Sequence, residues 1–458
     1  MAELNLPFEV KRLIYDHVDL PTLKSLRLVS QDWAVVGIDL LLLPTFIVKS
    51  SAFDIPRLIS LGNHPALARQ AASTIRTINF WSNDWDVVYL RSIFCSRHVH
   101  LRNYEAVAFV PTRDEQEALE ELDALIQQRN LESEQGESIE VLTKALKSVP
   151  RLQKLHITCP NQFSHPMLRK VWEEYNLETY RQDLRYIGPA RLLNIFSAAQ
   201  AAELSITKFQ HDQFNSNFLC EDGDTNIPWR FPRHVNALRS LSLNINDVLN
   251  CNLSLKFAFD GESNAEDNWS RTPWTKNLMS VPDILESLSI TCEALDRLRL
   301  DFLQTPAPNL HTLSLVGTSI SAPDFLTFLT SRAPSLRRLH LGSVELRISH
   351  PPNSTYDWQN FLSDLRDSIG HGSQNQSQSQ KQARTPLQKF QLSGVIKSPL
   401  PNGPTWMMWP MYRSSEEEWD AMPVRKASEK AKEMERFVVE GGEWPMGAED
   451  DISSMMVS

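Results

Sequence analysis

Few side chains in this sequence have the types and spacing that metal binding requires. The stretch Asp222–Asn226 (DGDTN) resembles the opening of a calcium-binding loop, whose ligands are side-chain oxygens at alternate positions. However, the sixth position, which needs glycine, is Ile227, and the twelfth, which needs glutamate, is Arg233. His98 and His100 have a spacing that suits an extended segment, but they lack a recognisable third ligand nearby. We therefore expect no metal ion.

The sequence also lacks the motifs that bind nucleotides or activate a nucleophile. It contains no G-x-x-x-x-G-K-[ST], no G-x-G-x-x-G and no G-x-S-x-G. Its five cysteines are widely spread and form no C-x-x-C motif, which favours reduced thiols over disulfides or a zinc site. We expect no cofactor, no catalytic residues and no enzymatic activity. The polar stretches 211–234 and 261–277 are expected to be loops, and an enzyme with an unrecognised site in them is the alternative.

The side chains best suited to binding a partner lie in a segment where apolar and polar residues alternate. Arg338 offers a positive charge and His340 a titratable ring. The apolar Leu339 lies between them, and the apolar Leu341 follows. Such alternation is typical of a strand with one buried face.

This segment belongs to a recurring pattern, L-x-x-L-x-L. Consecutive copies begin at Leu285, Leu310 and Leu336, which are 25 and 26 residues apart. Further copies begin at Ile75, Leu152, Leu238 and Leu387, and Leu204–Ile206 preserves only a strand. The spacing is that of leucine-rich repeats, in which each unit is a short strand followed by a returning segment. The pattern predicts an α/β fold of stacked parallel units, an irregular solenoid.

The residues between the apolar positions of each copy are predicted to share the opposite face of the strands. We expect this face to be the substrate-binding surface. The candidate substrate-binding residues are Ser289, Ser314, Arg338 and His340.

One returning segment shows how a helix is expected to follow a strand. The start at Ser321 has Pro323 in the first turn, and Phe325–Leu329 supplies apolar residues for a buried face. Pro334 ends the segment. The preceding return, 293–303, is expected to bury its leucines in the same way.

The N-terminal residues 6–33 form a second informative stretch, LPFEVKRLIYDHVDLPTLKSLRLVSQDW. Pro7 and Glu9 suit the first turn of a helix, and Val10, Leu13, Ile14 and Val18 then follow with amphipathic spacing. A second apolar stripe follows at Leu23, Leu26, Val29 and Trp33. The two short helices carry more large apolar residues than they can bury against each other, so they need a partner.

This stretch resembles the F-box. The elements that match are Leu6, Pro7, Glu9, Val10, Ile14, Leu23, Leu26, Val29, Ser30 and Trp33, in a register without gaps. Together with the leucine-rich pattern, the sequence is similar to the F-box/leucine-rich-repeat proteins, particularly the divergent fungal ones. The resemblance implies a three-helix F-box followed by the repeats. It also implies that the F-box binds the Skp adaptor and, through it, a cullin.

By this resemblance the protein is expected to be the substrate-recognition subunit of a Skp–cullin–F-box ubiquitin ligase, with an unknown protein substrate. The resemblance assigns adaptor contact or the F-box core to Leu6, Pro7, Ile14, Leu20, Leu23, Leu26, Val29 and Trp33. The alternative is a non-ligase interaction scaffold with the same two regions.

The expected domains are the F-box at 1–44, the repeat region at 45–400 and a C-terminal segment at 401–458. A polar low-complexity stretch at about 371–384 is expected to be a disordered loop. The segment from 401 is rich in tryptophan and methionine, and we interpret it as a cap over the last repeat, with a partner-binding patch as the alternative.

The net charge of −10 argues against nucleic-acid binding, which needs a concentrated basic face. The start of the sequence lacks the apolar stretch of a secretory signal, and the most apolar run, 38–48, is too short to span a membrane. We therefore expect a location in the cytoplasm, the nucleus or both.

Overall fold

The computed structural model of the protein contains two compact units, each with mixed α and β structure and mostly parallel strands. The first unit comprises Met1–Tyr175 and Tyr186–Ile206, and the second comprises Asn176–Arg185 and Thr207–Ser458. The expected α/β class is therefore confirmed. The structure describes residues 6–18, 22, 25, 26, 28–30, 33, 36, 44–65, 67–81, 91, 94, 95, 111–135, 138–158, 163–177, 188–215, 237–247, 284–292, 298, 299, 307–347, 356–369, 387–397, 405–408 and 424–447.

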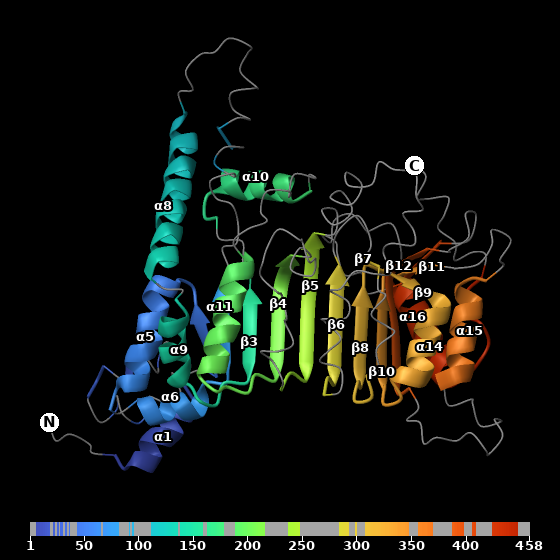
Figure 1. The fold of residues 1–458 in the computed structure, drawn as a ribbon, viewed down its shortest axis with the longest axis horizontal. Coiled ribbons are helices and arrows are strands. Elements are labelled where there is room, and N and C mark those ends of the chain that lie inside the picture. The colour runs from blue at the N-terminus through green and yellow to red at the C-terminus, as the bar shows by residue number, and fades with distance from the viewer. Residues whose placement is uncertain are drawn as a thin grey trace, which may run out of the picture. The chain divides into compact units, whose positions relative to one another are not determined.

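The first unit combines three parallel strands with helices (Figure 1). The strands are β1 (Thr45–Val48), β2 (Thr77–Trp81) and β3 (Lys154–Thr158). The helices are α1 (Phe8–Asp16), α5 (Ser51–Asn63), α6 (Ala68–Thr74), α8 (Arg113–Gln135), α9 (Ile139–Lys147), α10 (Pro166–Leu177) and α11 (Gly188–Ala201). Helix α5 contacts α6, α8 and α9, and α9 also contacts α11.

In the second unit six parallel strands lie side by side and point the same way (Figure 1). They are β4 (Lys208–Asn215), β5 (Ser240–Asp247), β6 (Ser287–Cys292), β8 (Thr312–Val316), β10 (Arg338–Gly342) and β12 (Lys389–Lys397). A second parallel row consists of β7 (Leu298–Arg299), β9 (Thr318–Ser321), β11 (Glu345–Arg347) and the end of β12. The helices are α14 (Ala322–Thr327), which continues into a π-helical turn (Phe328–Arg332), α15 (Trp358–Ile369) and α16 (Val424–Val439).

The apolar positions of the L-x-x-L-x-L copies form the core of these strand rows. The second position of each copy in the second unit pairs in register with the next, from Leu241 through Leu288, Leu313 and Leu339 to Phe390. All five side chains are buried. The prediction that these residues point into a core is confirmed.

One copy of the pattern was assigned wrongly from the sequence. Residues Leu204–Ile206 do not form a strand, and the copy consists of Ile206, Phe209 and His211, which places β4 in register with β5. His211 takes a leucine position and is buried, with its ring edge-on to Phe209 and Phe214. The expected loop 211–234 is therefore also wrong at its start, because β4 continues to Asn215.

Neighbouring strands are joined by a repeated backbone contact at their starts. One carbonyl oxygen before each strand accepts hydrogen bonds from two successive N–H groups of the next copy, at 2.8–3.1 Å. The accepting residues in the second unit are Thr207, Arg239, Glu286, His311 and Arg337, and those in the first unit are Pro44 and Arg76. The contact uses only backbone atoms, so these positions hold residues of very different chemistry.

A left-handed residue links the two strand rows. Gly317, Ser343 and Gly394 occupy the same register position and have φ angles of 65°, 47° and 73°. A residue with a positive φ angle turns the chain between the strand of the first row and the strand of the second row within one copy of the pattern. The sequence analysis did not predict this second row of strands. The prediction of a helical return at 293–303 is therefore wrong at Leu298, which lies in β7 and not in a helix.

The helix after β9 forms as predicted. Ser321 is its N-cap residue and Pro323 lies in the first turn. Phe325 stacks on Phe328 and on Phe361 of α15, with ring centroids 6.5 and 6.1 Å apart. These buried rings form the layer that joins α14 to α15.

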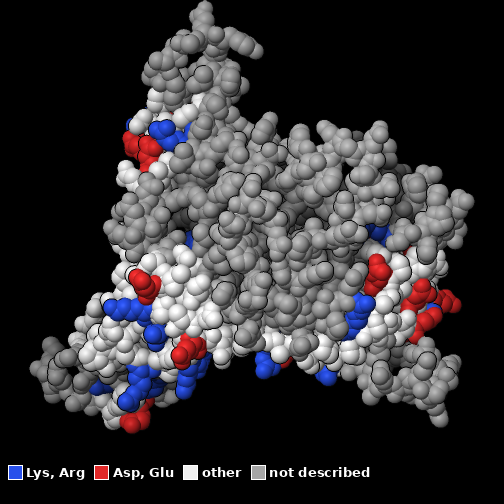
Figure 2. All heavy atoms as spheres, viewed as in Figure 1, with Lys and Arg blue, Asp and Glu red and all other residues white. Residues whose placement is uncertain are grey.

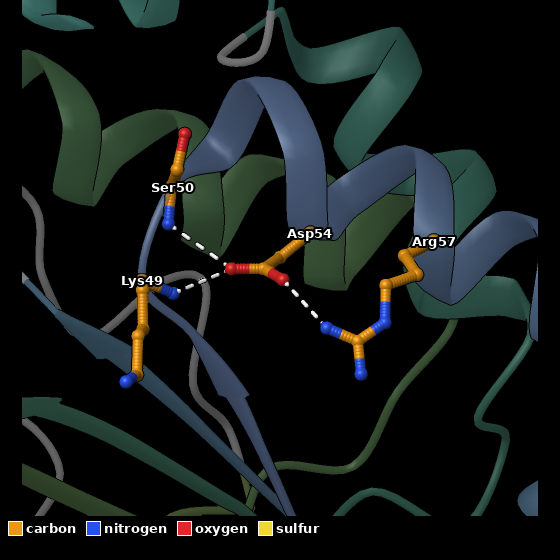
Figure 3. A network of polar contacts seen from close by, with 4 residues as sticks. All are labelled: Lys49, Ser50, Asp54 and Arg57. Carbon is orange, nitrogen blue, oxygen red and sulfur yellow. Dashed lines mark hydrogen bonds and ion pairs between the residues drawn. The ribbon is translucent and has the colours of Figure 1, made fainter.

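Helix α5 begins with an unusual cap (Figure 3). The Asp54 carboxylate accepts hydrogen bonds from the backbone N–H groups of Lys49 and Ser50, at 2.8 and 3.1 Å, and pairs with Arg57. Asp54 thus ties the end of β1 to the first turns of α5, whose positive end favours a carboxylate. The Ser50 side chain points away from this network and makes no capping bond.

At the C-terminal end, β13 (Thr405–Met408) pairs antiparallel with the last residues of β12. Trp406 and Met408 are buried, and α16 contacts β12, β13 and α15. The remaining aromatic and sulfur-containing residues of this stretch, including Trp409 and Trp419, lie outside the described residues. The predicted loop at about 371–384 lies outside them as well.

The close approach at Gly317 leads to a stability prediction. An alanine Cβ there would lie 1.9 Å from the Cys292 carbonyl oxygen, on a backbone with positive φ. We expect Gly317→Ala to lower the free energy of unfolding by about 2–4 kcal/mol.

Gly441→Ala is the matched control, since Gly441 also has a positive φ but no atom within 4 Å of the added Cβ. It should cost about 1–2 kcal/mol, from backbone strain alone. Urea unfolding of both variants measures the difference, and equal losses would contradict the steric explanation.

Candidate functional site

The N-terminal segment has a small core that orients its helices. Tyr15 and Val36 are buried, and Val18, Leu26 and Trp33 pack against them. The Tyr15 hydroxyl donates a hydrogen bond of 2.6 Å to the Trp33 carbonyl oxygen, and the two rings meet edge-to-face with centroids 5.5 Å apart. This contact joins α1 to the residues around Trp33.

The turn before Trp33 explains the serine in this motif. The Leu28 and Val29 N–H groups donate to the carbonyl oxygens of Ser25 and Leu26, which closes the turn. The Ser30 hydroxyl then accepts a hydrogen bond from the Trp33 N–H group, at 3.4 Å. This is the geometry of an N-cap serine, whose side chain satisfies an amide of the first helical turn.

Several large apolar side chains of this segment remain exposed. The exposed fractions are 57% for Phe8, 40% for Val10, 60% for Leu13, 88% for Leu28 and 68% for Val29. We call these five the N-terminal apolar residues. Water contact with this much apolar surface is unfavourable, and such residues are typical of a binding surface for another protein.

The buried face of α1 differs from the predicted one. Lys11 and Tyr15, four residues apart, are buried, whereas Val10 and Leu13 of the predicted apolar stripe are exposed. The amphipathic spacing was present, but the buried side is rotated from the predicted stripe and shares only Val18 with it, so that the tyrosine packs against Trp33. The sequence analysis gave Leu13 a place only in the apolar stripe of the helix, and it gave Phe8 and Leu28 no role.

The candidate adaptor-binding residues divide between surface and core. Pro7 and Val29 are exposed, and Leu6 and Ile14 are partly buried. Leu26 and Trp33 are also partly buried and pack on the core described above. Leu20 and Leu23 lie outside the described residues.

The second unit presents a polar surface on the side of the strands opposite the buried leucines. We call it the polar face. The parallel register aligns Ser242, Ser289, Ser314, His340 and Gln391 across its middle, one from each of five neighbouring strands. All five are partly buried, and Arg338 beside them is exposed. The four candidate substrate-binding residues thus lie together on one face.

His340 is held on both sides by serine hydroxyl groups. Its Nδ1 atom lies 2.9 Å from Ser314 Oγ, and its Nε2 atom lies 2.8 Å from Ser393 Oγ. Burial lowers the pKa of His340 below its ordinary value of 6.5, and the positive charge of Lys389 lowers it further. A neutral imidazole has one donor and one acceptor nitrogen, so one serine donates to the ring and the other accepts from it.

The described residues contain no group of three or more His, Cys, Asp or Glu side chains that could hold a metal ion. Within the same residues, no helix is both long and apolar enough to cross a membrane. Charged side chains of both signs are interspersed on the surface that Figure 2 shows.

Comparison with known proteins identifies no relative: no protein-family model matches the chain, and no curated protein matches it. The function is therefore inferred from the N-terminal apolar residues and the polar face.

The charge of Lys389 leads to a prediction about His340. Lys389→Gln should raise the pKa of His340 toward 6.5, because it removes a nearby positive charge while burial remains. NMR titration of the imidazole measures this shift. Arg436→Gln, on α16, serves as the control and should leave this pKa unchanged.

The same lowered pKa affects stability. The unfolded chain takes up a proton at this position before the folded chain does, so the folded state should lose stability as the pH falls through about 6.5. His340→Gln should reduce this loss. Urea unfolding at about pH 7.5 and about pH 5.5 compares the two proteins, and an equal loss in both would show that His340 does not contribute.

Proposed function

We propose that this protein is the substrate-recognition subunit of a Skp–cullin–F-box ubiquitin ligase. Its N-terminal segment binds the Skp adaptor, and its polar face binds a protein substrate. The protein performs no chemistry of its own in this role, because bringing a substrate close to the ubiquitin-carrying enzyme is sufficient to accelerate transfer.

The observation that carries this proposal is the exposure of the N-terminal apolar residues within the segment that resembles the F-box. Full burial of one large apolar side chain contributes about 1.5–3 kcal/mol to association, before the costs of binding. Several such side chains on short helices fixed by the Tyr15–Trp33 contact provide a preorganised surface for another protein. Preorganisation lowers the entropy lost on binding.

The leucine-rich pattern supports the second half of the proposal. The strands of the second unit repeat in register, with buried leucines on one side and the polar face on the other. A row of identical units gives a broad surface on which side chains vary independently of the core. Under this proposal, β13 and α16 cover the end of the last repeat, and the burial of Trp406 and Met408 is consistent with that role.

The adaptor-binding half of the proposal predicts the effect of charge at the exposed apolar positions. Leu13→Asp combined with Val29→Asp should reduce capture of the Skp adaptor at least about tenfold, because a carboxylate would be buried in the interface without a partner. The measurement is a pull-down quantified by mass spectrometry for adaptor and cullin. Thermal unfolding should change little, since both side chains are exposed.

Ile284→Asp is the matched control, because Ile284 is also an exposed apolar residue but lies in the second unit. It should leave adaptor capture unchanged. Undiminished capture by the double variant would overturn the proposed adaptor surface. Capture of adaptor without cullin by the unmodified protein would favour the non-ligase scaffold instead.

A further inference from the structure

Arg338 and Lys389 lie side by side on the polar face. Their positions are opposite each other in the parallel register of β10 and β12, so their backbones are about 4.8 Å apart. Both side chains are exposed, and neither forms an ion pair with a described residue. Like charges at opposite positions of neighbouring strands destabilise a sheet. Among the residues that the structure describes, no ion pair offsets this repulsion.

An ion pair between the copies of β5 and β6 shows a different arrangement. Arg239, in the position just before β5, pairs with Glu286 just before β6, at 2.5 Å between Nη1 and Oε1. There the neighbouring copy supplies a carboxylate for the arginine. At Arg338 the neighbouring copies supply Thr312 on one side and Lys389 on the other.

The strands that carry the two cations, β10 and β12, and the neighbouring strand β8 contain no Asp or Glu. The row that includes them consists of Lys208, Ser240, Ser287, Thr312, Arg338 and Lys389. The next two rows along these strands, at 242–289–314–340–391 and then 244–291–316–342–393, also lack Asp and Glu. The whole chain has 56 acidic against 46 basic residues, so this face has the opposite sign to the net charge of −10.

We propose that Arg338 and Lys389 bind an anionic segment of the protein substrate, whose carboxylate or phosphate groups lie over the two cations. The inference rests on the proposed function and specifies the chemical class of its substrate. Arginine binds such groups through two parallel N–H donors, and lysine supplies a second charge. Thr312 and Gln391, partly buried neighbours in the register, offer further hydrogen-bond donors.

A protein segment fits this site better than a nucleic acid does. A nucleic-acid backbone needs many cations along an extended track, whereas the three rows contain Lys208, Arg338 and Lys389, of which only the last two lie on neighbouring strands. His340 adds no third charge at neutral pH, because its pKa lies below 6.5 and its ring is bonded to two serines.

Fluorescence anisotropy with the full-length chain tests this inference. The probes are a labelled oligoglutamate peptide, a phosphoserine peptide of equal charge, an oligoglutamine peptide and an oligothymidine of the same length. Oligoglutamate should bind and oligoglutamine should not. Arg338→Gln combined with Lys389→Gln should weaken oligoglutamate binding about five- to tenfold at low salt, and added salt should weaken binding to the unmodified protein.

The peptide arms identify the source of the negative charge. Tighter binding of the phosphoserine peptide would indicate a phosphorylated substrate, and equal binding would indicate carboxylates; either result supports the proposal. Lys432→Gln with Arg436→Gln removes two exposed cations from α16 in the same unit and should have no effect.

Four results would overturn the proposal: no binding of an anionic peptide by the unmodified protein, equal weakening by the α16 variant, no weakening by the Arg338/Lys389 variant, or tighter binding of oligothymidine than of either anionic peptide. Adaptor capture is measured on the same preparations and should be unchanged in the Arg338/Lys389 variant. If the unmodified protein captures the adaptor but binds no anionic peptide, the inference fails and the proposed function stands. If it binds the peptide but no adaptor, the anionic site stands and the proposed function fails.

Discussion

The architecture depends on a backbone contact in which one carbonyl oxygen accepts two successive N–H groups from the next copy of the repeat. Each of these contacts fixes the register of the following strand before any side chain is considered. A slip of one residue would move the leucines from the core to the polar face, so the register decides which chemistry the surface displays. Pro44 fits this scheme at the edge strand β1, because it accepts two hydrogen bonds but has no N–H group to donate to a preceding strand.

The parts of the fold that follow from periodicity could be predicted, and the parts that depend on single substitutions could not. The L-x-x-L-x-L copies and the helix after Ser321 form where their spacing indicates. The copy with His211 was missed because a buried histidine held by two phenylalanines replaces leucine. The second strand row was not predicted because it depends on residues with positive φ angles. A serine such as Ser343 rarely adopts this conformation, so its residue type did not indicate the turn.

The candidate site shows a similar division. Alternation along each strand correctly placed Ser289, Ser314, Arg338 and His340 on one face. The side-chain bridge from Ser314 through His340 to Ser393 was not predictable, because its members lie 26 and 53 residues apart. In the N-terminal segment, two adjoining sides of α1 both carry apolar groups, and the choice between them depends on the packing of Tyr15 against Trp33. Hydrophobic spacing alone does not determine which side of the helix is buried.

The antiparallel pairing of β13 with β12 has a consequence for the evolutionary history of this protein. Inside the row, each copy presents the same backbone donors and acceptors to both neighbours, so duplication or loss of one copy leaves every neighbour satisfied. Past the end of β12 the chain reverses direction, and β13 takes the place beside Gly394–Lys397 where a further parallel copy would pair in the second row. Lineages of this protein should therefore differ in length through copies gained or lost between β4 and β12, while the strand that reverses direction stays at the end.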